Sequence, residues 1–123
     1  MRNLKTTKFT LLLLIVGGLC CSFLLKPVQL INTSLTVTVR DEVGNTVGGA
    51  SIKLFDTEEN YNQEKNSIAE GITDAKGVYR FKKIKANSYF VLVKKDDKDN
   101  AGGGEKIGKL EEGKFNKVTI VIQ

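Results

Sequence analysis

Residues 71–93, GITDAKGVYRFKKIKANSYFVLV, show the clearest strand pattern in the chain. It predicts three short strands joined by two tight turns, because Asp74 and Gly77 bracket one reversal and Asn87 supplies the next. In the second and third strands, aromatic and β-branched residues occur at every other position, which is typical of strands with one buried face. The residues expected to point inward are Tyr79 and Phe81 in one strand and Tyr89, Val91 and Val93 in the other.

The same alternation recurs on both sides of this stretch. Turn-forming residues separate the apolar runs at intervals of roughly 8 to 14 residues, and no amphipathic helix stands out. About seven short strands are therefore predicted, including strands in 67–73 and 106–110, and they indicate an all-β, antiparallel, Ig-like sandwich of two facing sheets. The other expected inward rows are Leu35, Val37 and Val39; Ala50, Ile52 and Leu54; and Val118, Ile120 and Ile122.

The first 25 residues differ in composition from the rest. They contain three basic residues and no acidic one, and an apolar run begins at Phe9. A positive end followed by an apolar core is the pattern of an export or anchor segment. The predicted organisation is a signal peptide or membrane anchor at 1–25, a linker at 26–34 and one β-sandwich domain at 35–123.

Three fates of the N-terminal segment are open, and each places the domain outside the cytoplasm. Acylation of Cys20 or Cys21 would make a lipoprotein, although the residues before either cysteine match the usual acylation signal poorly. An uncleaved anchor at 9–25 has 17 residues, the lower limit for crossing a bilayer. Simple cleavage would secrete the domain. The first two fates predict an extracytoplasmic protein that is attached to a membrane through this segment or through a lipid on cysteine.

The inventory of side chains excludes several kinds of site. The chain has no histidine, and both cysteines lie in the N-terminal segment, so zinc sites of His and Cys, Ser/His/Asp triads and Cys/His dyads are excluded. After residue 25 there are 16 basic and 14 acidic side chains, a net charge of only +2. We interpret Arg80, Lys82, Lys83 and Lys85 as a solvated sheet edge and turn, and we expect no nucleic-acid partner.

Two acidic stretches are predicted to be long connections: 56–66 is a loop or one helical turn, and 95–104 is a loop. Tyr61 of the first stretch is expected to lie back over the sheet. In the second, Asp97 and Asp99 match the first and third places of a calcium loop, but Gly108 stands where the bidentate glutamate belongs. We therefore predict no metal ligands and no cofactor. A carbohydrate- or calcium-binding module that uses both loops is the alternative hypothesis.

A candidate partner surface follows from the strand alternation. If Val91 and Val93 face the core, Phe90 and Leu92 face the other way, and so does Val121 in the last strand. Apolar residues on the solvent side indicate either a partner or a covering loop. The two acidic loops are long enough to provide that cover, so both readings stand.

The domain contains the tracts VRDEVGNTVGGASIKLF and TDAKGVYRFKKIKANSYFVLV. Together these tracts resemble the carboxypeptidase regulatory-like domain and its relatives, the transthyretin-like or prealbumin-like sandwiches. The resemblance covers about 35–123. One departure is Asn87, where the family usually has glycine, and asparagine is the next best residue for a left-handed bend. A single domain of this kind on a short leader resembles small bacterial lipoproteins of the cell surface or the periplasm, which implies one of these two locations.

The resemblance implies a function without catalysis. In carboxypeptidases this domain accompanies a separate catalytic domain, and in pilins of this fold an internal Lys to Asn or Asp crosslink uses positions that here hold Thr38 and Val93. We therefore expect neither peptidase activity nor that crosslink. The function expected is a non-enzymatic, membrane-tethered extracytoplasmic β-sandwich that serves as an interaction or accessory module, with a cell-envelope protein or glycan as its partner.

Overall fold

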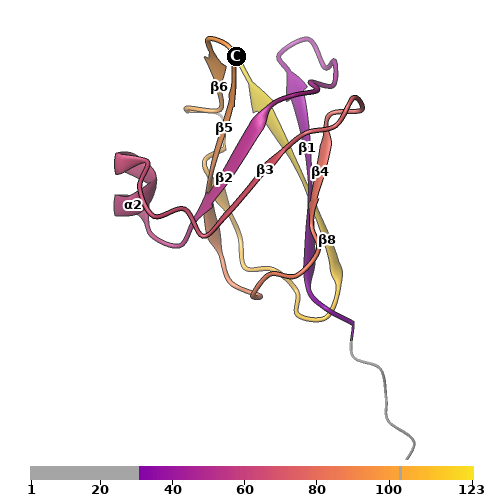
Figure 1. The fold of residues 1–123 in the computed structure, drawn as a ribbon, viewed down its shortest axis with the longest axis vertical. Coiled ribbons are helices and arrows are strands. Elements are labelled where there is room, and N and C mark those ends of the chain that lie inside the picture. The colour runs from indigo at the N-terminus through magenta and orange to yellow at the C-terminus, as the bar shows by residue number, and fades with distance from the viewer. Residues whose placement is uncertain (1–30, 103) are drawn as a thin grey trace, which may run out of the picture. The chain divides into compact units, whose positions relative to one another are not determined.

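Eight strands and one short helix make up the part of the chain described by a computed structural model, residues 31–102 and 104–123 (Figure 1). The predictions for residues 1–30, including Cys20 and Cys21, fall outside the described residues. None of the described helices is long and apolar enough to span a membrane. The elements are β1 (Ser34–Asp41), β2 (Ser51–Phe55), α2 (Glu58–Gln63), β3 (Ala69–Ile72), β4 (Val78–Phe81), β5 (Tyr89–Lys95), β6 (Lys98–Asp99), β7 (Lys106–Ile107) and β8 (Phe115–Ile122).

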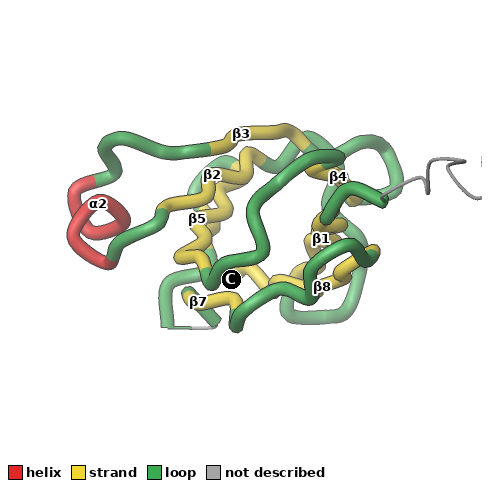
Figure 2. Tube along the Cα trace, turned by 90° about the horizontal axis from the view of Figure 1, so that it is seen from below, coloured by secondary structure: helices red, strands yellow, loops and turns green. Residues whose placement is uncertain are grey.

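The strands form two facing sheets, which confirms the predicted all-β sandwich. One sheet has three strands in the order β4-β1-β8, and the other has the order β3-β2-β5-β6, with β7 also paired to β5. Seen along the strands, the sheets are two layers, and α2 lies on the outer side of the layer that contains β2 and β5 (Figure 2). The helix occupies the first acidic stretch, for which a loop or one helical turn was predicted, whereas β6 falls in the second, which was predicted to be a loop.

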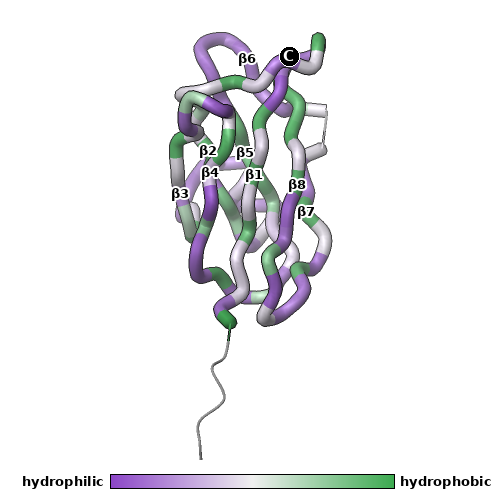
Figure 3. The backbone as a smooth tube through the Cα atoms, turned by 90° about the vertical axis from the view of Figure 1, so that its right-hand side faces the viewer, coloured by the Kyte–Doolittle hydropathy of each residue, from purple (hydrophilic) through white to green (hydrophobic). Residues whose placement is uncertain are grey.

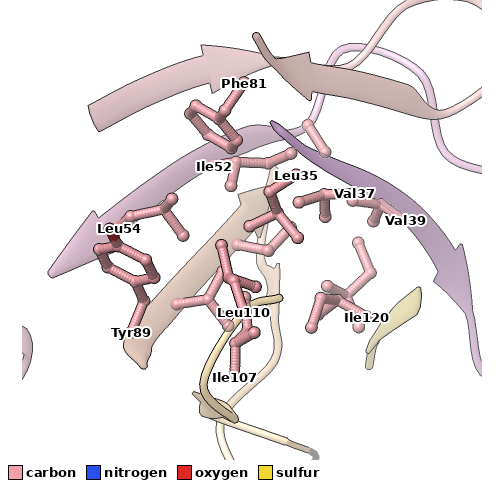
Figure 4. Close-up of a cluster of buried hydrophobic side chains, with 14 residues drawn as sticks. Leu35, Val37, Val39, Ile52, Leu54, Phe81, Tyr89, Ile107, Leu110 and Ile120 are labelled. Atoms are coloured by element: carbon pink, nitrogen blue, oxygen red, sulfur yellow. The ribbon is translucent and has the colours of Figure 1, made fainter. Parts of the chain in front are cut away.

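The buried residues of both layers meet in one core. Every residue of the predicted inward rows is either buried or packed against the core, as Figure 4 shows for several of them. Leu35, Val37 and Val39 of β1 are fully buried and face Ile52 and Leu54 of β2. Strand alternation thus predicted the interior correctly, because a period of two places every second side chain on the same face.

The turn that Asp74 and Gly77 bracket forms as predicted. The Asp74 carboxylate accepts hydrogen bonds from the backbone N–H groups of Lys76 and Val78, at 2.9 and 3.1 Å. Gly77 has φ +75, and a Cβ there would lie 2.9 Å from the Val47 nitrogen, so only glycine fits. The left-handed bend expected at Asn87 does not occur. The described non-glycine residues with positive φ are Glu64, Asn66 and Asp96.

One strand pair differs from the expected antiparallel pattern. β1 and β8 run parallel along their whole length, from Ser34 beside Phe115 to Asp41 beside Ile122. A parallel pair needs a long crossover, and here the chain from β2 to β7 provides it. Alternation does not encode which strands are neighbours, so the sequence pattern could not reveal this pairing.

Candidate functional site

The three residues of the predicted partner surface lie on two different faces. Phe90 and Leu92 are on the outer face of the five-stranded sheet, while Val121 is on the outer face of the three-stranded sheet. Val121 is 40% exposed, as the alternation predicted. Phe90 is half-buried and Leu92 is only 8% exposed, which agrees with the covering loop rather than an open partner surface at these two positions. The physical reason is the cover supplied by residues 56–66.

Helix α2 is the centre of that cover. Its N-cap is Thr57, whose hydroxyl accepts a hydrogen bond from the Asn60 N–H at 3.1 Å. Its C-cap is Glu64, which has the left-handed backbone conformation. Tyr61 projects from this helix onto the sheet. Its ring lies 5.9 Å from the Phe55 ring, edge to face, and 5.9 Å from the Phe90 ring. Aromatic packing of this kind fixes the helix over the outer face of the sheet.

Charged side chains surround this aromatic cluster, which we call the Tyr61 cluster and define as Phe55, Tyr61 and Phe90. The Lys106 ammonium lies 5.7 Å from the centre of the Phe90 ring, and the Lys94 ammonium pairs with the Glu64 carboxylate at 2.6 Å. Both members of that ion pair are nearly half exposed, so it adds little stability. The pair joins Glu64, the C-cap of α2, to β5.

The Tyr61 hydroxyl is held in its neutral form. Burial raises the pKa of Tyr61 from 10.0 to about 12, and the Glu105 carboxylate adds to the rise through its charge and a hydrogen bond. Burial also raises the pKa of Tyr89, whose hydroxyl donates to the Lys85 carbonyl oxygen at 2.5 Å. At neutral pH the Tyr61 cluster therefore offers aromatic surface, a phenol O–H and a nearby carboxylate.

The acidic residues do not gather into a metal site in the part of the chain that the structure describes, where no three His, Cys, Asp or Glu side chains are close enough to share an ion. Several of them instead hold turns. The Asp99 carboxylate accepts from the Ala101 N–H and the Glu105 carboxylate from the Gly102 N–H, both at 2.9 Å. Both carboxylates thus bind backbone donors in the turn after β6, a role that needs no ion.

The outer face of the three-stranded sheet carries a second candidate surface. Its outward positions hold Arg80 of β4 and Phe115 and Lys117 of β8, and the Arg80 guanidinium lies 4.9 Å from the centre of the Phe115 ring. Phe115 is 61% exposed. Figure 3 faces this sheet and shows hydrophilic, purple segments toward the lower ends of β4 and β8.

Sequence reasoning missed this second surface because it treated Arg80 and the lysines after it as an isolated edge. The alternation that placed Val121 outward also places Phe115, Lys117 and Thr119 outward, which was the available signal. The alternation could not predict that β1 pairs with β8. This pairing brings residues 80 and 117 to opposite sides of Thr36.

Comparisons with known proteins bear on the fold. No family model and no curated protein matches the chain. Among solved structures, the group B streptococcus pilus 2b backbone protein matches 74% of this chain with a TM-score of 0.52 and 17% identity. The chain spans 40% of the length of that protein. Transthyretin from Sparus aurata matches 72% of this chain and 87% of its own length, with a TM-score of 0.36 and 17% identity.

At such low identity, likeness to a solved structure informs on architecture alone. The match to the pilus backbone protein agrees with the two facing sheets and the single shared core described above. The chain has a β-sandwich fold, as its sequence led us to expect.

Proposed function

We propose that this protein is a non-enzymatic β-sandwich that is tethered outside the cytoplasm by its N-terminal segment and serves as an interaction or accessory module of the cell envelope. The observation that carries the proposal is the short distance along the chain between the apolar segment and the sandwich. β1 begins at Ser34, so eight residues separate it from residue 25, the predicted end of that segment. A domain attached in this way stays near the membrane.

The likeness to a pilus backbone protein supports this placement, because that protein is part of a surface assembly by its name. The accessible outer face of the three-stranded sheet supports the interaction role. It combines the exposed apolar side chains Phe115 and Val121 with the cations Arg80 and Lys117. Exposed apolar groups among charges are typical of surfaces that bind a partner.

The tether is tested by fractionating cells that express the full chain and measuring the intact mass of the protein in each fraction. We expect the protein in the membrane fraction, resistant to a carbonate wash and accessible to protease added from outside. Acylation, cleavage and retention of the segment each give a different mass. Replacement of Cys20 or Cys21 by serine removes attachment only if that cysteine is acylated. Unprocessed protein in the cytoplasmic fraction would overturn the proposal.

The interaction role is tested with a photocrosslinking residue in place of Val121. We expect a specific adduct in cells, because this position lies on the accessible face. The matched control is Val43, which is 80% exposed in the turn after β1 and away from that face. Equal adducts from both positions, or none from Val121, would rule out this face as the partner surface.

A second candidate function is binding of a carbohydrate or a cation at the Tyr61 cluster. The observation that favours it is that, in addition to burial, carboxylates from both stretches predicted as acidic loops, Glu64 and Asp99, act together with Glu105 to raise the pKa of Tyr61. Calorimetry with calcium and with a panel of glycans tests it. Binding heat that Tyr61→Ala abolishes would support it, and the absence of heat from all of them would dismiss it.

A further inference from the structure

At the end of the sandwich where β1 begins, hydrogen bonds from backbone N–H groups join three segments of the chain. The Thr33 carbonyl oxygen accepts from the Ile84 N–H at 3.1 Å, and the Thr33 hydroxyl accepts from the Gly113 N–H at 2.8 Å. The Ser34 N–H donates to the Lys114 carbonyl oxygen at 3.1 Å. The segments 80–88 and 109–117 are thus held around the first residues of the sandwich, and we call them together the basic end.

Charge is distributed very unevenly between this end and the rest of the domain. The basic end has seven basic and two acidic side chains, a net charge of +5, while the rest of 31–123 has eight basic and twelve acidic, a net charge of −4. All seven cations are exposed. The two acids are Glu111 and Glu112, and Glu111 lies 3.8 Å from the Lys114 ammonium. The cations are Arg80, Lys82, Lys83, Lys85, Lys109, Lys114 and Lys117.

Two large apolar side chains are exposed at the same end. Ile31 is 59% exposed and Phe115 is 61% exposed. Their positions are linked, because Ser34 pairs with Phe115 and the Ile31 carbonyl oxygen lies 3.5 Å from where a Gly113 Cβ would be. Exposed apolar and aromatic side chains ringed by Lys and Arg are the composition of protein surfaces that rest in the headgroup region of a bilayer.

We propose that the basic end docks on anionic phospholipid headgroups, so that the sandwich stands on the membrane with this end toward it. This inference rests on the tether proposed above. Five residues, 26–30, separate the predicted apolar segment from Ile31, and fully extended they reach at most roughly 18 Å. The tether therefore keeps the basic end within reach of the surface, where a negative potential attracts cations over about one Debye length.

The test uses the full chain with vesicles of phosphatidylcholine alone and vesicles that also contain phosphatidylglycerol. Flotation reports attachment, and the rate at which each lysine is acetylated reports contact. We expect Lys82, Lys83 and Lys114 to react about fivefold more slowly on the anionic vesicles, and high salt to abolish the difference. Lys76 and Lys98, which are exposed elsewhere, are expected to react equally on both.

Matched charge reversals sharpen the result. Lys82→Glu/Lys83→Glu is expected to remove the protection of the remaining basic end, whereas Lys76→Glu/Lys98→Glu, with the same change in net charge, is expected to leave it intact. If the control pair has the same effect as Lys82→Glu/Lys83→Glu, the attraction is one of net charge and the docking proposal falls.

The outcomes separate docking from tethering. Flotation with both vesicle types and equal lysine reactivity would leave the tether standing and overturn docking. Flotation with anionic vesicles alone, with the lysines protected, would support docking and overturn the tether. Flotation with neither would overturn both. Protection by a soluble acidic polysaccharide but not by anionic vesicles would assign the basic end to a glycan partner and overturn docking on lipid.

Discussion

The side-chain amide of Asn100 replaces a missing strand beside Val93. Its oxygen accepts a hydrogen bond from the Val93 N–H at 2.9 Å, and its nitrogen donates to the Val91 carbonyl oxygen at 2.9 Å and to the Gly104 carbonyl oxygen at 3.2 Å. On this side of β5, β6 pairs only with residues 94–95 and β7 only with 89–90. The fully buried Asn100 satisfies backbone groups in the gap between them.

Replacement of Asn100 by alanine is therefore expected to destabilise the domain strongly. It removes three hydrogen bonds and leaves buried backbone groups unsatisfied, at a cost of about 3 kcal/mol in the free energy of unfolding. For a domain of this size the melting temperature should fall by roughly 15 °C. Denaturant and thermal unfolding measure this. Asn62→Ala, on an exposed position of α2, is the control and should change little. Equal effects of the two substitutions would contradict the role of Asn100.

Asn100 also shows which kind of feature could not be predicted from this sequence. Inward rows such as Leu35, Val37 and Val39 were predictable, because apolar alternation has a direct physical cause in burial. Asn100 lies in a polar run, and in sequence an amide that completes a sheet looks the same as one that is solvated. Its role depends on the gap between β6 and β7, which only the assembled sheet creates.

For the candidate site, the sequence predicted the direction of single side chains but not which of them lie together on one surface. It predicted that Tyr61 would lie over the sheet and that Phe90 and Leu92 would face away from the core. It grouped Val121 with Phe90, although these residues belong to different sheets, because alternation gives the direction of a side chain and not its sheet. The basic end was also hidden, since 80–88 and 109–117 are brought together through Thr33.

Replacement by serine is expected to destabilise the domain strongly at Leu92 and only slightly at Val121. Leu92 is 8% exposed on the outer face of the five-stranded sheet, so Leu92→Ser should cost about 3 kcal/mol through lost burial and a buried hydroxyl. Val121 is 40% exposed, so Val121→Ser should change the free energy of unfolding by less than about 0.5 kcal/mol. Urea unfolding of both variants checks this. A stable Leu92→Ser protein would show that the cover of this face is loose.

The raised pKa of Tyr61 predicts a loss of stability in alkaline solution. The folded state holds this pKa at about 12, whereas the unfolded chain has the ordinary value of 10.0. The unfolded state therefore releases its proton first as the pH rises. The contribution of Tyr61 is fully present below pH 10 and is lost between about pH 10 and 12. Unfolding curves at several pH values measure the effect.

Tyr61→Phe is the matched control for this titration, because it keeps the ring packing and removes the ionising hydroxyl. The variant should lose less stability than the parent protein over the same pH interval. The rest of the chain is identical in the two proteins, so its contribution cancels in the comparison. Absorbance at alkaline pH should also show that the parent has a late-titrating phenol that the variant lacks. Parallel pH profiles of the two proteins would mean that the Tyr61 hydroxyl is not buried as described.

Gly71 is expected to be irreplaceable because it leaves space for Tyr79. Gly71 of β3 lies opposite the inward Ile52, and a Cβ at this position would be 2.3 Å from the Tyr79 ring. That ring spans from β4 toward β3 and packs edge to face on Phe81, with centroids 4.8 Å apart. Gly71→Ala should therefore displace Tyr79 from the edge of the core and cost about 2 kcal/mol.

Gly108→Ala is the control for Gly71→Ala. No atom lies within 4 Å of a Cβ at Gly108, and its φ is not in the left-handed region, so alanine should be tolerated there. Gly71→Ala combined with Tyr79→Ala isolates the steric effect. Once the ring is absent, the added methyl group has room and should cost much less than it does beside Tyr79. An equal cost of Gly71→Ala with and without the ring would place the strain in the backbone of β3 instead.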